Sequence, residues 1–208
     1  MIQIVAFSRI ISMRAFDFTL SSREILTSLT STSTQTIWML LWGVVLVGHI
    51  LVIAFWLSLF NILRGTNYGL APFGTVIAIV SEIFYLMIVG LSLAGEPFLA
   101  NTFAAAPEAE KNIAVAAMTA LGAFLYSWGL TAIITCGGAA ILLGAVMARG
   151  SELNPYLGWA LVALGALFIV SVTLPGAIIE ALIAYPAYWT WLIIAGIILW
   201  RRGRAITT

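Results

Sequence analysis

The chain has 208 residues, of which 62% are hydrophobic and only 8% are charged. Soluble domains carry about 25% charged residues because their surface faces water, so this composition excludes an ordinary soluble globule. The net charge of +1 gives no reason to expect nucleic-acid binding, and a single cysteine and a single histidine exclude an internal disulfide and a familiar metal site. The composition predicts a protein that is solvated mainly by lipid.

The N-terminal segment, residues 1–36, is too polar to span a bilayer, because Arg9, Arg14 and Asp17 interrupt it. Apolar residues recur between these charges at helical spacing, at Ile4, Phe7, Ile10 and Ile11. This pattern predicts an amphipathic helix that lies in the membrane interface. The alternative is a targeting presequence, which also has arginines and lacks acids.

Five apolar bands follow, and each predicts a transmembrane helix of an all-α membrane protein. They cover about residues 37–63, 70–94, 121–147, 156–179 and 186–200, so the five-helix domain spans 37–204. About 20 apolar residues are needed to cross a bilayer. We expect the second band to end at Gly95-Glu96-Pro97 and the fourth to kink at Pro175.

The uncharged stretch 112–148 predicts one long helix, with its first turns outside the bilayer and its later part spanning it.

The basic residues predict the orientation of the five spans. With the C-terminus inside, the inner side receives most of the arginines next to the spans, at Arg64, Arg149, Arg201, Arg202 and Arg204. The outer side receives Arg23 and Lys111. The positive-inside rule therefore favours an outer N-terminus and a cytoplasmic C-terminus.

Three stretches resemble the DUF4386 family of prokaryotic multi-pass membrane proteins, whose function is uncharacterised. They are FWLSLFNILRGTNYGLAPFG, YSWGLTAIITCGGAAILLGAVMARGSELNPYLGWALVALGALF and YPAYWTWLIIAGIILWRRG. The resemblance implies a helical bundle in a prokaryotic plasma or inner membrane. The chain departs from the family in lacking a further opening span, in having Ile79 in place of an arginine, and in lacking an acid in its closing helix.

Three residues inside the apolar bands are ionisable: His49, Glu82 and Glu180. A charge at mid-membrane costs about 2.5–3.5 kcal/mol on insertion scales. Glu180 falls near the outer end of its span, where headgroup water explains it. His49 and Glu82 fall near the centres of consecutive spans and are expected at similar depth.

Two further polar stripes run along the predicted helices. Glu82 shares a face with Thr75, Ala78 and Tyr85, and a second face carries Ser127, Thr131, Thr135 and Gly138. We expect both faces to look inward. The predicted intramembrane polar site therefore consists of His49, Glu82, Tyr85, Thr131 and Thr135.

This constellation has three interpretations: a proton or solute site, hydrogen bonds that hold helices together, and a contact to another subunit. No cofactor is predicted, since a haem on His49 would need its second ligand from another chain or a methionine. Close approach of helices within the bundle is expected at the glycines, namely Gly137, Gly138, Gly144, Gly158 and Gly165.

The function favoured by the sequence is a non-catalytic accessory or structural subunit of a larger membrane complex, in contact with lipid and with other membrane subunits. The alternative is a small proton-coupled transporter or permease that uses Glu82 and His49. No hydrolase, zinc-protease, phosphate-loop or dinucleotide motif occurs in the sequence. An intramembrane enzyme or redox subunit is therefore a weaker, third hypothesis.

Overall fold

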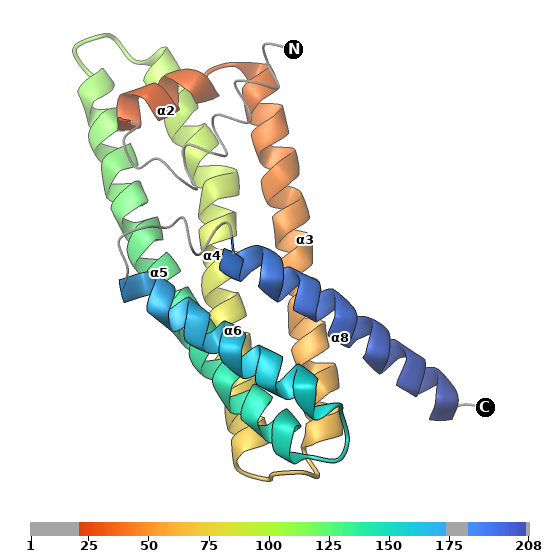
Figure 1. Cartoon of the computed structure of the whole chain (residues 1–208). Helices are drawn as coiled ribbons and strands as arrows, with labels where there is room; N and C mark the ends of the chain where they lie inside the picture. The colour runs from red at the N-terminus through yellow and green to blue at the C-terminus, as the bar shows by residue number, and fades with distance from the viewer. Residues whose placement is uncertain (1–20, 174–182, 207–208) are drawn as a thin grey trace. The chain divides into compact units, whose positions relative to one another are not determined.

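The computed structural model describes residues 21–173 and 183–206, and within these ranges it contains helices, turns and no strand. The helices, shown in Figure 1, are α2 (Ser22–Leu29), α3 (Thr32–Leu63), α4 (Leu70–Ala105), α5 (Lys111–Arg149), α6 (Pro155–Thr173) and α8 (Tyr185–Ile206). The predicted all-α class is confirmed. The predicted amphipathic residues of 1–20, the kink at Pro175 and Glu180 lie outside the described residues.

Four of the described helices are long and apolar enough to cross a membrane: α3, α4, α5 and the Pro155–Val172 part of α6. These helices suggest a multi-pass membrane protein. The fifth predicted span, 186–200, lies within α8, which is helical but is not one of the four. Tyrosines and tryptophans at its start and arginines near its end reduce its hydropathy. Its crossing of the membrane stays a prediction.

Most helix boundaries lie close to the predicted ones, but α3 begins at Thr32 instead of 37, α8 continues to Ile206 instead of ending at 200, and α4 runs past its predicted end. Helix α3 ends at the predicted Leu63, and residues 112–148 form a single helix as expected. The predicted end of the second band at Gly95-Glu96-Pro97 is wrong, because α4 continues to Ala105. A proline removes one helical hydrogen bond. Here burial outweighs that loss, since a continuous stripe of α4 is buried on both sides of Pro97, at Ser92, Glu96, Ala100 and Phe103.

Helices α3, α4 and α5 are longer than a bilayer requires. They contain 32, 36 and 39 residues, which at 1.5 Å per residue corresponds to about 48, 54 and 58 Å. The hydrocarbon core of a bilayer is about 30 Å thick. Each of the three helices therefore has several turns more than a perpendicular crossing needs.

The chain divides into two compact units. Unit 1 comprises residues 1–49 and 84–129, and unit 2 comprises residues 50–83 and 130–208. Each of the long helices α3, α4 and α5 supplies one part to each unit, whereas α2 belongs to unit 1 and both α6 and α8 belong to unit 2.

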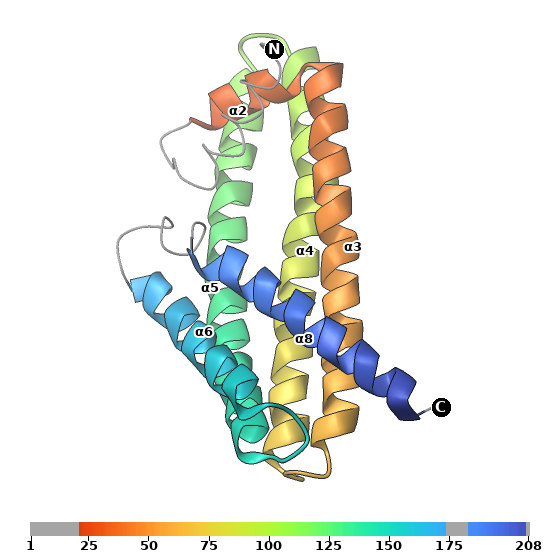
Figure 2. The same cartoon turned by 45° about the vertical axis from the view of Figure 1, so that its right-hand side comes forward.

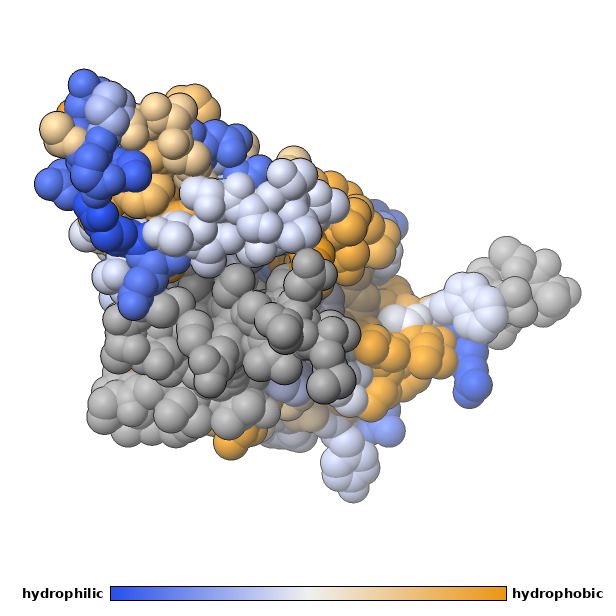
Figure 3. All heavy atoms as spheres, turned by 90° about the horizontal axis from the view of Figure 1, so that it is seen from above, coloured by the Kyte–Doolittle hydropathy of each residue, from blue (hydrophilic) through white to orange (hydrophobic). Residues whose placement is uncertain are grey.

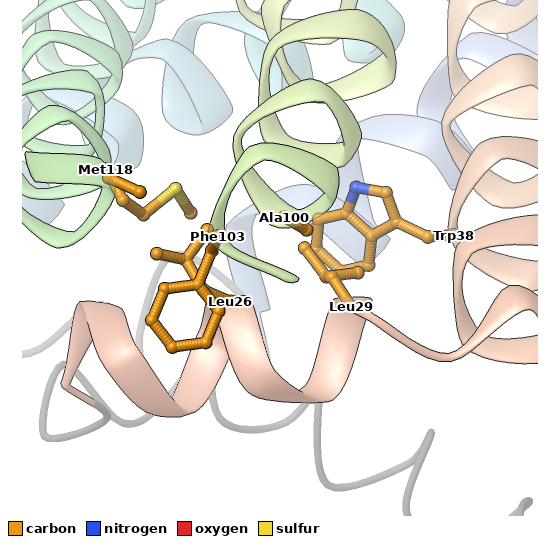
Figure 4. Close-up of a cluster of buried hydrophobic side chains, with 7 residues drawn as sticks. Leu26, Leu29, Trp38, Ala100, Phe103 and Met118 are labelled. Carbon is orange, nitrogen blue, oxygen red and sulfur yellow. The ribbon is translucent and has the colours of Figure 1, made fainter. Parts of the chain in front are cut away.

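In unit 1, the short helix α2 lies across the ends of α4 and α5 (Figures 1 and 2). A capping box between Ser21 and Glu24 fixes its first turn. Its buried residues Leu26 and Leu29 join a cluster drawn from four helices (Figure 4), whose other members are Trp38, Ala100, Phe103, Ala114 and Met118. Burial of a leucine side chain is worth about 1.5–3 kcal/mol, so these contacts hold α2 on the bundle.

Polar contacts also hold α2 on the bundle. Arg23 pairs with Glu108 at 3.2 Å and donates to Asn112 Oδ1 at 3.3 Å, and the hydroxyls of Ser22 and Thr119 are 2.7 Å apart. Hydrophilic residues gather on one side of this end of the unit in the view from above (Figure 3). Unit 1 therefore combines an apolar interior with a polar rim.

In unit 2, α5 and α6 pack backbone against backbone at glycines. A Cβ at Gly144 would lie 2.7 Å from the carbonyl oxygen of Gly158, and one at Gly137 would lie 2.8 Å from that of Gly165. The predicted close approach within the bundle is confirmed at these four positions. At Gly138 it is wrong, since a Cβ there would meet nothing within 4 Å.

Helix α8 packs on α6 in the same unit. Trp191 Nε1 donates to the carbonyl oxygen of Leu157 at 3.0 Å. The rings of Tyr185 and Tyr188 both lie edge-on to Phe168, at centroid distances of 5.5 Å.

Replacing Gly158 by alanine is expected to lower the thermal unfolding midpoint in detergent by about 2–12 °C. The added methyl must displace the backbone of α5, and overpacking of this kind costs about 1–3 kcal/mol, where 1 kcal/mol corresponds to about 2–4 °C in a chain of this size. Gly138→Ala is the matched control and should leave the midpoint unchanged or raise it. Equal midpoints for the two variants would contradict the glycine contact.

The docking of α2 is expected to weaken in acid. Hydrogen bonds and charge attraction from Lys111 and Arg23 lower the pKa of Glu108 below its usual value of 4.5. A carboxyl with a lowered folded pKa stabilises the fold above its unfolded pKa, and this contribution is lost as the pH falls through the folded value. Hydrogen-exchange protection factors of α2, corrected for the intrinsic rate, should therefore decrease between pH 6 and pH 3.

The control for this experiment is Glu108→Gln, which removes the titrating group. Protection of α2 in this variant should be lower at pH 6 and should change less with pH. If wild type and variant respond to pH in the same way, Glu108 is not the group responsible.

Candidate functional site

Glu82 is the most deeply buried of the predicted site residues. Its side chain is 1% exposed in unit 2, where Trp56 Nε1 donates a hydrogen bond to Oε1 at 3.5 Å. Trp56 is itself 1% exposed and lies nearly parallel to Trp191, with ring centroids 6.4 Å apart. The carboxyl group is therefore held between helices α3 and α4, with an aromatic pair from α3 and α8 beside it.

Two buried side chains from other helices complete the polar surroundings of Glu82. Cys136 of α5 is 2% exposed, and it faces the hydroxyls of Ser81 and Tyr188. Tyr188 of α8 is 4% exposed, with Cys136 and Glu82 as its electrostatic neighbours. Sequence reasoning missed Tyr188, because it stands among aromatic residues at the start of α8 that are typical of an interface.

The face of α4 that carries Glu82 is buried as predicted. Thr75, Ala78 and Tyr85 are all at most 9% exposed. The hydroxyl of Thr75 donates to the carbonyl oxygen of Ala71 at 2.8 Å, which satisfies it within its own helix.

His49 lies in unit 1 and stacks on Tyr85. Their ring centroids are 4.8 Å apart and the ring planes differ by 17°, with exposures of 7% and 9%. The structure thus brings two of the predicted site residues together. His49 belongs to unit 1 and Glu82 to unit 2, and the pair predicted between them stays a prediction.

The polar stripe of α5 differs from the prediction. Ser127 and Thr131 are exposed and Thr135 is half-buried, so the expectation of an inward-facing stripe is wrong for the first two. The hydroxyl of Thr135 donates to the carbonyl oxygen of Thr131 at 2.7 Å. The buried face of α5 is formed instead by small and apolar residues, among them Ala132, Cys136, Ala139 and Ala140.

A second buried carboxyl, Glu96, lies in unit 1 and was missed by the sequence reasoning. Its side chain is 0% exposed and accepts a hydrogen bond from Ser92 Oγ at 3.3 Å. Trp38 Nε1 donates to the carbonyl oxygen of Ser92 at 3.1 Å. The glycine and proline that flank Glu96 favoured a turn, whereas the spacing of Ser92, Glu96 and Ala100 indicates one helical face.

The chemistry available at these sites is hydrogen bonding by carboxyl, imidazole, thiol and phenol groups, of which carboxyl and imidazole are the usual proton carriers inside membrane proteins. Among the described residues, no group of three or more His, Cys, Asp or Glu side chains is placed to hold a metal ion. The expectation about cofactors, including a haem on His49, stays a prediction.

Comparison with known proteins finds no matching family model, no matching curated protein and no matching solved structure.

If Glu82 holds the helices of unit 2 together, Glu82→Ala should lower the unfolding midpoint by about 5 °C or more. The change leaves a cavity and deprives the buried Trp56 N–H of its acceptor, which costs about 1–3 kcal/mol for the lost acceptor alone. Glu82→Gln retains a carbonyl oxygen and should stay within about 2 °C of wild type. An equal effect of the two substitutions would show that the hydrogen bond is unimportant. The exposed Glu152, replaced by alanine, controls for loss of charge.

Proposed function

We propose that this multi-pass membrane protein serves as a non-catalytic accessory or structural subunit of a larger membrane complex. The observation that carries the proposal is an open apolar groove along α3 in unit 1, with a volume of about 600 Å³. The residues that line it are Thr36, Met39, Leu40, Gly43, Val44 and Val47.

The groove has the character of a helix-packing surface. Leu40, Val44 and Val47 are between 54% and 71% exposed, and a Cβ at Gly43 would meet nothing within 4 Å. Small residues between apolar side chains allow helix backbones to approach closely in lipid. A spanning helix of a partner subunit is the occupant that this surface suits.

The described polar groups support a structural function in a second way. Between α3 and α4, the indole N–H of Trp56 donates to Glu82 and that of Trp38 donates to the carbonyl oxygen of Ser92, and the rings of His49 and Tyr85 stack on one another. Interactions of this kind hold helices together in a bilayer.

The membrane arrangement that we propose has five spans. Helix α8 supplies the fifth, since Trp191, Leu192 and Ala195 are buried. The arginines near its end favour a cytoplasmic C-terminus, and therefore an outer N-terminus, with α2 at the outer interface. The likeness to the DUF4386 family supports a prokaryotic plasma or inner membrane.

Substitution of Gly43 by tryptophan tests the accessory function. The large side chain fills the groove, and since Gly43 has no close neighbour the fold of the chain should be unaffected. Purification of the tagged wild type from native membranes in mild detergent should give stoichiometric membrane partners, and Gly43→Trp should lose at least about 80% of them. The matched control is Gly90→Trp, at another glycine of unit 1 whose Cβ would meet nothing within 4 Å.

A wild-type chain that purifies as a folded monomer from native membranes contradicts the accessory function. Equal partner recovery for the two tryptophan variants contradicts the groove as the docking surface.

A second function, proton-coupled transport, is favoured by one observation: the carboxyl of Glu82 is fully buried, with the polar side chains of Cys136 and Tyr188 beside it. Ionisable residues inside membrane spans often mark proton and ion pathways. In proteoliposomes with an imposed pH gradient, Glu82→Gln and His49→Ala should abolish solute-dependent proton flux while the unfolding midpoint of Glu82→Gln is retained. Glu152→Gln, an exposed substitution outside the described helices, should leave the flux intact.

A further inference from the structure

The hydroxyl of Tyr188 is a buried polar group that the helices of unit 2 do not satisfy directly. Tyr188 is 4% exposed, and its hydroxyl lies beside the Cys136 thiol, a weak partner, without a hydrogen bond of ordinary geometry to any of the residues that the structure describes. An unsatisfied buried hydroxyl is unfavourable by about 1–3 kcal/mol. Buried side-chain polar groups in native proteins therefore have a partner in the large majority of cases, either in the protein or in an ordered water.

The groups around this hydroxyl are themselves polar. Cys136 and Glu82 are its main electrostatic neighbours, and they come from α5 and α4, whereas Tyr188 comes from α8. Ser81 Oγ already donates its hydrogen to the carbonyl oxygen of Ala78 at 2.8 Å. Its lone pairs can therefore accept a hydrogen bond from another group. Glu82 accepts from Trp56, and a carboxyl group has about four lone-pair sites.

Together these groups offer the donor and the acceptors that one bound water needs. Tyr188 supplies a donor, while Glu82 and Ser81 supply acceptors and Cys136 supplies a weak group of either kind. An internal water makes about three hydrogen bonds to polar groups that are otherwise unsatisfied, and folded proteins hold about one such water per 27 residues.

We propose that unit 2 binds an internal water molecule between Tyr188, Glu82, Ser81 and Cys136. The water accepts a hydrogen bond from the Tyr188 hydroxyl and donates hydrogen bonds to Glu82 and Ser81, and in this way it links α4 to α8. Cys136 forms the α5 side of the site. The water site is independent of the proposed accessory function, since it concerns the interior of unit 2 and requires no partner subunit.

Infrared difference spectroscopy of partly dehydrated films in ordinary water and in H₂¹⁸O tests the site. The wild type should show an O–H stretching band of a strongly hydrogen-bonded water that shifts on ¹⁸O exchange. Tyr188→Phe should remove this band, while Tyr156→Phe, which changes an 81% exposed tyrosine of the same unit, should retain it. Absence of the band from wild type, or its persistence in Tyr188→Phe, overturns the proposal.

Thermal unfolding gives a second readout with a definite sign. Tyr188→Phe keeps the edge-on contact with the ring of Phe168 and removes only the hydroxyl. With the water bound, the loss of its hydrogen bond should lower the unfolding midpoint by about 2–4 °C. A hydroxyl without a partner predicts the opposite, an unchanged or higher midpoint, and that result also overturns the proposal.

If Tyr188→Phe does not fold, Ser81→Ala provides the test of the water site. This smaller change removes one acceptor of the water and should shift the frequency of the ¹⁸O-sensitive band. A band with the same frequency in Ser81→Ala and wild type contradicts the proposed site.

Discussion

In lipid there is no water to satisfy a polar group, so each buried donor and acceptor must find its partner inside the protein. This constraint explains what the structure does with its few polar side chains. Serine and threonine hydroxyls donate to carbonyl oxygens one turn earlier, as Thr75 and Ser171 do. Indole N–H groups reach across to other helices, from Trp56 to Glu82 and from Trp38 to the backbone of Ser92. Polar groups thereby become the links between helices.

The second constraint is packing without a hydrophobic driving force between helices. Lipid chains are as apolar as leucine, so helices associate through close contact of their surfaces. Glycines at Gly137 and Gly144 on α5, and at Gly158 and Gly165 on α6, bring the two backbones together in unit 2. In unit 1 the short helix α2 covers an apolar cluster instead. Arg23 of α2 holds the helix in place through an ion pair with Glu108 at the edge of that cluster. The open face of α3 in the same unit is the surface that we assign to a partner.

The candidate site was predicted in part. The buried face of α4 with Glu82 and Tyr85 follows from helical spacing, and the structure agrees with it. The prediction that Ser127 and Thr131 face inward on α5 is wrong, because a hydroxyl that bonds to its own backbone is tolerated on an exposed helix face as well as on a buried one. Glu96 was missed because a local glycine–proline pattern favoured a turn. Packing along the whole length of α4 outweighed that local preference.

The sequence by itself determined the helical class and the apolar bands, because hydropathy and helical spacing depend only on the order of residues along the chain, and it predicted four of the five glycine contacts correctly. It also determined that few ionisable residues lie inside the bands. The tertiary structure alone decided which polar residues are neighbours, since residues far apart in the chain meet only when helices pack. The stacking of His49 on Tyr85, the burial of Glu96, and the grouping of Glu82, Cys136 and Tyr188 from three helices all depend on that packing.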